Sequence, residues 1–128
     1  MAGEAPAGRR LSLSQEQRLE RSWEFDRVRR EGQRVVKGCL ILNWRAEEGG
    51  PDVSRIGVVT SRKIGGAVVR SRARRLLREV FRRHQHDFVR PVEMVLVARQ
   101  SISDKGYADV ERDFVSAARQ GKILRGTS

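Results

Sequence analysis

The side chains best suited to chemistry lie between residues 62 and 83, where nine basic residues accompany one acidic residue, Glu79. Guanidinium groups bind phosphate through paired hydrogen bonds and stack on exposed bases. A solvated helix face usually mixes both signs of charge, and a helix on a membrane surface usually carries large aromatic residues, so both alternatives match less well. The segment therefore favours nucleic-acid binding. Its basic residues are Arg62, Lys63, Arg70, Arg72, Arg74, Arg75, Arg78, Arg82 and Arg83.

The other reactive residues do not form a recognisable catalytic site. His84 and His86 are the only histidines, and their spacing places them on different faces of a helix, which favours solvated surface positions over metal ligands. The glycine patterns that cradle nucleotide phosphates, GxxxxGKS or GxxxxGKT and GxGxxG, do not occur. Acidic residues are scattered, so a nuclease that acts alone is disfavoured.

Length and charge limit the class of protein. The chain has 128 residues and a net charge of +11, with 27 Lys and Arg against 16 Asp and Glu, which favours one compact domain with a polyanionic partner. Cys39 is the single cysteine, so an internal disulfide is excluded and a buried thiol in a reducing compartment is expected. No apolar run approaches the ~20 residues of a membrane span. We expect a cytoplasmic protein with no membrane partner.

Hydrophobic periodicity predicts the elements that must position the arginines. A helix is expected over 14–32, with a second segment starting near Ser22, and strands over 34–45 and 55–61 that run antiparallel. A basic helix follows Gly65 and Gly66, and a strand over 92–99 and a helix over 101–121 come after it. The basic helix is expected to turn one apolar arc toward the core, made of Val69, Ala73, Leu76 and Val80, with Leu77 on its flank.

This order predicts an α+β fold, a two-layer sandwich with helices packed on a small mixed sheet. Residues 1–13 are expected to be a flexible basic segment, 14–121 an RNA-binding domain and 122–128 a short basic tail. A basic helix beside a sheet, with neither a dimerising heptad nor helix-turn-helix spacing, suits irregular RNA better than DNA. Trp44, at the end of the first strand, is expected to pack in the core.

Residues 55–82, RIGVVTSRKIGGAVVRSRARRLLREVFR, closely resemble the signature region of the bacterial ribonuclease P protein component. In that family a strand leads through a lysine-containing turn and a Gly-x-Ala-Val step into a helix with an Arg-x-Arg-x-x-Arg pattern. The resemblance extends from about Arg18 to about Gly121, since RLERSWEFDRVRREG is similar to the first helix of the family and MVLVAR to its third strand.

The resemblance implies a non-catalytic protein subunit of an RNA-based endoribonuclease that matures the 5′ end of tRNA, with Mg²⁺ held mainly by the RNA subunit. It also implies a left-handed βαβ crossover. Its partners would be the ribonuclease P RNA subunit and precursor tRNA. The family pattern assigns RNA contact to Arg62, Lys63, Arg70, Arg72, Arg74, Arg75 and Arg78, and the cleft for the single-stranded 5′ leader to Phe25 and Arg29.

Three positions depart from the family pattern. Gly66 and Ser71 stand where the family usually has asparagine, and Arg29 stands where a second aromatic is common, which predicts leader contact that depends more on charge than on stacking. Phe25 is equally well explained as a core residue. A ribosomal RNA-binding protein is the alternative function, because it could carry the same sheet and basic helix.

Overall fold

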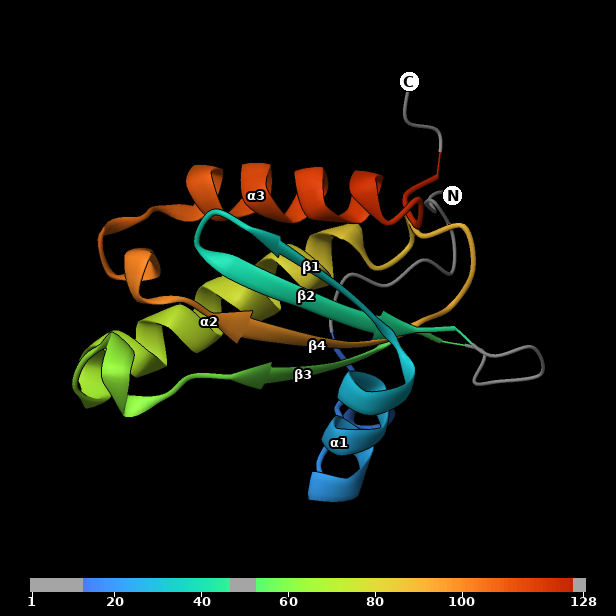
Figure 1. Cartoon of the computed structure of the whole chain (residues 1–128), viewed down its shortest axis with the longest axis horizontal. Coiled ribbons are helices and arrows are strands. Elements are labelled where there is room, and N and C mark those ends of the chain that lie inside the picture. Colours follow the sequence, from blue (N-terminus) through green and yellow to red (C-terminus); the bar gives the residue numbers. More distant parts are fainter. Residues whose placement is uncertain (1–12, 47–52, 126–128) are drawn as a thin grey trace, which may run out of the picture.

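The computed structural model describes residues 13–46 and 53–125, which form three α-helices and a four-stranded sheet (Figure 1). The predicted α+β class is confirmed. The α-helices are α1 (Ser22–Glu31), α2 (Ala67–His84) and α3 (Tyr107–Gln120), and the strands are β1 (Gln33–Lys37), β2 (Leu40–Arg45), β3 (Arg55–Val59) and β4 (Glu93–Ala98). Short 3-10 helices span Gln15–Gln17, Arg62–Ile64 and Gln100–Asp104.

The sheet has the strand order β1-β2-β4-β3, with antiparallel pairs β1–β2 and β2–β4 and the parallel pair β3–β4. The prediction of one strand over 34–45 is wrong, because the chain reverses at Gly38, whose φ of 54° favours glycine, and forms a hairpin there. β3 runs antiparallel to β2 as expected, but β4 lies between them.

The crossover from β3 to β4 passes through α2. In Figure 1 both strands point to the left, β4 lies above β3, and α2 passes behind the sheet. A connection with this path is left-handed, the reverse of the usual hand, as the resemblance implied.

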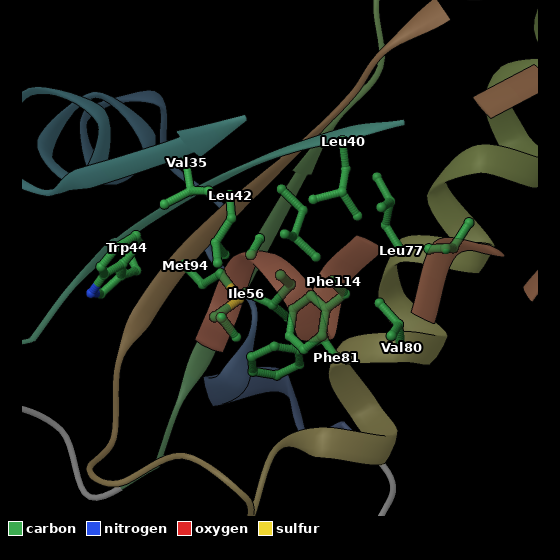
Figure 2. Close-up of a cluster of buried hydrophobic side chains, with 14 of the residues drawn as sticks. Val35, Leu40, Leu42, Trp44, Ile56, Leu77, Val80, Phe81, Met94 and Phe114 are labelled. Carbon is green, nitrogen blue, oxygen red and sulfur yellow. The ribbon is translucent and has the colours of Figure 1, made fainter. Parts of the chain in front are cut away.

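The main core fills the space between the sheet and the helices α2 and α3 (Figure 2). Leu42, Ile56 and Met94 of the sheet meet Phe81 of α2 and Phe114 of α3, and all five are buried. The buried residues of α2 are Ala73, Leu77, Val80 and Phe81, whereas Val69 and Leu76 are only half-buried. The predicted apolar arc is therefore rotated, because the sheet and α3 together cover the Leu77 and Phe81 side.

Helix α1 packs on the opposite face of the sheet. Val28 and Leu19 are buried against Val95, whose side chain points away from the main core. The ring of Phe25 lies over Gly57, where an added Cβ would stand 2.4 Å from Phe25 Cε2. Glycine in β3 thus lets α1 approach the sheet closely.

The end of the described chain also packs on the domain. Ile123 and Leu124 are buried, and Val89 donates its amide hydrogen to the Ile123 carbonyl over 2.9 Å. Residues 122–125 are thus part of the packed body, while the segment predicted over 1–13 lies almost wholly outside the described residues. Trp44 and Cys39 are buried, as expected. Among the helices of the described ranges, none is long and apolar enough to cross a membrane.

Candidate nucleic-acid interface

A groove of about 650 Å³ runs along the outer side of α2, between this helix and the segment that precedes α1. Five guanidinium groups and one carboxylate line it, so its charge is strongly positive and suits an anionic ligand. The lining residues are Leu13, Arg18, Ser71, Arg74, Arg75, Arg78, Glu79 and Arg82. We call it the α2 groove.

Arg75 and Arg78, like Arg18, hold charge in the α2 groove that no side chain among the described residues neutralises. Arg75 is exposed and Arg78 is half-buried, and neither donates a hydrogen bond or forms an ion pair within the described residues. Burial lowers the pKa of Arg78, and the nearby charges of Arg18 and Arg74 lower it further. The clustering of like charges on a partly dehydrated wall is unfavourable until an anion binds, so these residues are the centre of the candidate interface.

Three other arginines that were predicted to contact RNA form hydrogen bonds within the protein. Arg70 donates to the Gly65 carbonyl over 3.0 Å, and Arg72 donates to the Lys105 carbonyl. Arg74 donates to Thr60 Oγ1 over 2.8 Å. These half-buried arginines therefore fix α2 to its neighbouring turns. Arg62 and Lys63 are exposed on the 3-10 turn before α2, outside the lining of the α2 groove.

Glu79 moderates the charge at one end of the α2 groove. Its carboxylate accepts hydrogen bonds from Arg82 over 2.7 Å and from Arg83 over 2.8 Å. The bond from Arg82, followed by that from Arg83 and the charges of both arginines, lowers the Glu79 pKa to about 2 against the opposing effect of burial. Arg82 and Arg83 are therefore weaker candidates than Arg75 and Arg78.

Arg18 also lines the α2 groove, although it was not among the predicted RNA contacts. It forms an isolated parallel bridge with Ile56, and the next residue, Leu19, donates its amide to the Ile56 carbonyl over 2.9 Å. This short pairing carries the Arg18 side chain to the groove wall. Its only signal in the sequence is that the family resemblance begins at about this residue. Because residues 14–32 were expected to be mostly helical, the pairing of Arg18 with a strand was not predicted.

A second candidate surface lies on the face of the sheet that carries α1. The strand registers align Val36, Ile41, Val97 and Val59 in one row across all four strands, one residue pair beyond the row where α1 packs. Ile41, Val59 and Val97 are half-buried and Val36 is 42% exposed. We call these four residues the open row.

Phe25 and Arg29 lie one helical turn apart on α1. Phe25 is half-buried and packs with Val59 and Val97 against the small cluster around Val28. Its ring therefore contributes to the packing of α1 on the sheet and also borders the open row. Arg29 is exposed. The structure therefore places both predicted leader residues on the same side of α1, next to apolar side chains that bases could stack against.

A buried carboxylate ties α1 to the sheet. Glu93 is 4% exposed and accepts hydrogen bonds from Arg27 (3.0 and 3.1 Å), Arg45 (3.0 Å) and Arg55 (3.2 Å). Arg55 also reaches Glu24 over 2.8 Å, and Arg45 pairs with Glu31 over 3.5 Å. Burial acts to raise the Glu24 pKa, but bonds from the Glu20 and Arg21 amides and from Arg55 outweigh it and lower the value. The acidic residues that seemed scattered in the sequence are thus used to hold arginines.

The histidine expectation needs a correction. His84 is not a solvated residue, because its Nδ1 lies 3.0 Å from Asp87 Oδ2 and its Nε2 lies 2.8 Å from Glu111 Oε2. The contact with Glu111 joins the end of α2 to α3, and the contact with Asp87 holds the segment that follows α2. Across residues 13–46 and 53–125 we find no group of three or more His, Cys, Asp or Glu side chains that could hold a metal ion.

Comparison with known proteins identifies the family of this chain. The family model described as Ribonuclease P matches residues 13–121. The chain is 33% identical to the ribonuclease P protein component of Halalkalibacterium halodurans over 88% of this chain and 94% of that protein. It is also 33% identical to that of Clostridium novyi, over 77% of this chain and 88% of the relative.

Solved structures show the same fold. The ribonuclease P protein from Thermotoga maritima matches with a TM-score of 0.70 at 26% identity, covering 80% of this chain and 96% of that one. The Staphylococcus aureus protein matches with a TM-score of 0.76 at 22% identity, covering 85% and 98%. On the family match and the identity to curated relatives, this chain belongs to the ribonuclease P protein component family.

Proposed function

We propose that this chain is the protein subunit of ribonuclease P and that it binds the catalytic RNA subunit through the α2 groove. The observation that carries the proposal is the groove itself, in which Arg75 and Arg78 hold charge that no carboxylate among the described residues neutralises. Phosphate groups of a folded RNA supply the missing negative charge. Membership of the family makes the RNA subunit the expected source of these phosphates.

The single-stranded 5′ leader of precursor tRNA is proposed to bind along the open row, beside Phe25 and Arg29. Half-buried aliphatic side chains and an aromatic edge offer stacking surfaces to unpaired bases, and Arg29 offers a cation to the leader phosphates. Because Phe25 is wedged over Gly57, its ring is held in place before any RNA arrives.

In this proposal Mg²⁺ is held by the RNA subunit, and the protein contributes positive charge and position rather than a reacting group. Bringing two large RNAs together concentrates phosphate charge, and guanidinium groups at the contact offset the repulsion. Less Mg²⁺ is then needed to support endonucleolytic cleavage at the 5′ end of the tRNA. The same basic surface would also suit a ribosomal RNA-binding protein, but such a protein would not change precursor cleavage.

The assignment of the α2 groove is tested by the salt dependence of RNA-subunit binding. Replacing Arg75 and Arg78 together with Ala should weaken binding and reduce the log–log salt slope by about 1 to 2, because each lost phosphate contact removes about 0.7 to 0.9 of slope. The control is Arg90→Ala with Arg119→Ala, which removes the same charge from exposed positions that do not line the groove. An unchanged slope in the first variant, or an equal fall in the control, would contradict the assignment.

A further inference from the structure

Trp23 is the more exposed of the two aromatic side chains of α1. It is 54% exposed, whereas Phe25, two residues later, packs on the sheet. Leaving an indole ring in water forgoes the favourable burial that a Trp side chain usually obtains. The packing of this chain therefore does not account for tryptophan at this position.

The ring of Trp23 is nevertheless held in a defined place by Arg27. The guanidinium carbon of Arg27 lies 5.2 Å from the centroid of the indole, within the range of a cation–π contact. Arg27 is itself fixed from the other side, since its Nη2 donates to both oxygens of the buried Glu93 over 3.0 and 3.1 Å. A chain of contacts thus runs from the buried carboxylate to the exposed ring, and it orders the ring before a ligand binds.

The surroundings of Trp23 suit a nucleic acid. Trp23, Arg27 and Arg30 recur at i, i+4 and i+7, so they lie on one side of α1. Phe25 and Arg29 lie about 200° to 240° away around the helix, on the side that borders the open row. By helical spacing the carboxylates nearest this side are Asp26 and Glu31, one on each flank, and Glu31 pairs with Arg45 over 3.5 Å. An aromatic ring backed by one guanidinium and next to another offers a base a stacking surface and its phosphate a counterion.

We propose that Trp23 and Arg27 form a stacking site for an unpaired RNA base, separate from the α2 groove and from the open row. The proposal rests on the proposed function, because that function makes RNA the partner of this surface. Two sources of an unpaired base are compatible with the chemistry: the 5′ leader of precursor tRNA, and a loop or bulge of the RNA subunit.

Binding measurements with Trp23→Ala and Trp23→Phe separate these sources. The probes are a bacterial ribonuclease P RNA subunit alone, and then its complex with this protein titrated with precursor tRNA that carries an intact leader, an abasic leader or no leader. Loss of one stacked base should weaken one of these interactions about 5- to 150-fold in Trp23→Ala. Trp23→Phe should keep most of the affinity because it keeps an aromatic face. The control, Val89→Ala, shortens another exposed apolar side chain, which is 48% exposed and lies between α2 and β4.

Fluorescence supplies a second measurement that does not depend on the alanine variant. The chain has two tryptophans, Trp23 and the buried Trp44, so the difference in emission between the wild type and Trp23→Phe isolates Trp23. Its emission should be quenched by the RNA subunit alone if that RNA supplies the base. Quenching that appears only with an intact leader, and not with an abasic one, would assign the base to the leader.

Two results would overturn the stacking site. One is that the wild type binds RNA, that Trp23→Ala binds each RNA as tightly as the wild type does, and that the emission of Trp23 does not change on binding. The other is concentration-dependent self-association that Trp23→Ala abolishes, which would make the ring a contact between two copies of this chain. Failure of the proposed function looks different, because then no variant, nor the wild type, would bind the RNA subunit or increase precursor cleavage.

Discussion

Replacing Glu93 with Gln should test how α1 is held on the sheet. The carboxylate is 4% exposed and accepts bonds from Arg27, Arg45 and Arg55, whose side chains are 30%, 15% and 21% exposed. Breaking a buried ion pair by removing one partner costs about 3 to 5 kcal/mol. Because the three guanidinium groups retain partial contact with water, the lower end applies, and we expect a loss of about 3 kcal/mol in the free energy of unfolding.

The expected loss can be measured as a shift of the melting temperature. With an unfolding entropy of about 2.1 cal/mol/K per residue over roughly 110 ordered residues, 3 kcal/mol corresponds to a fall of about 10 to 15 °C. Calorimetry of the wild type and the variant at neutral pH would give this shift directly. The control is Glu31→Gln, since Glu31 pairs with Arg45 over 3.5 Å but is 49% exposed, and we expect a change of less than about 1 kcal/mol.

The same variant has an expected effect on RNA binding. At temperatures where Glu93→Gln stays folded, looser attachment of α1 should weaken the contribution of the leader to precursor affinity more than it weakens binding of the RNA subunit, because Arg75 and Arg78 of the α2 groove form no hydrogen bond or ion pair with Glu93. A melting temperature within about 2 °C of the wild type, or a loss in Glu31→Gln as large as in Glu93→Gln, would refute the role given to the buried carboxylate.

Two further predictions concern particular contacts. Gly57→Ala should displace the Phe25 ring, since the new Cβ would stand 2.4 Å from Phe25 Cε2. The variant should bind precursor that carries a leader less tightly than the wild type does, while its affinity for leaderless tRNA stays the same. Equal affinity of the variant and the wild type for the leader would argue against the open row. Glu79 has a pKa of about 2, below its ordinary value of 4.5, so its contribution to stability is present above about pH 4.5 and is lost as the pH falls toward 2. The melting temperature of the wild type should therefore exceed that of Glu79→Gln at pH 6, and the two should converge near pH 2. A difference in melting temperature that does not depend on pH would contradict the ion pairs.

The basic helix was predictable from the sequence because it depends on local pattern. The arginine spacing with the single acid Glu79 predicts an anion-binding helix, and the structure gathers Arg74, Arg75 and Arg78 along one groove. The position of the apolar arc was less accurate, because α3 covers α2 from one side and buries Phe81 in place of Val69.

Features that depend on distant segments were not predictable. The run of β-branched and aliphatic residues from Arg34 to Arg45 is continuous in propensity, and only the turn at Gly38 divides it. The position of β4 between β2 and β3 depends on tertiary packing, and the short connection between β2 and β3 does not indicate it. The partners of Glu93 are 38 to 66 residues away in the chain, so no local pattern marks the carboxylate as a buried anchor.

The most direct test of the account is cleavage of precursor tRNA by a bacterial ribonuclease P RNA at low Mg²⁺, with and without this protein. We expect correct 5′ processing when both are present and little cleavage by either alone, and we expect Arg75→Ala with Arg78→Ala to raise the Mg²⁺ concentration needed. RNA binding with no gain in cleavage would contradict the proposed function in favour of a ribosomal role, and cleavage by the protein alone would contradict the assignment of the chemistry to RNA.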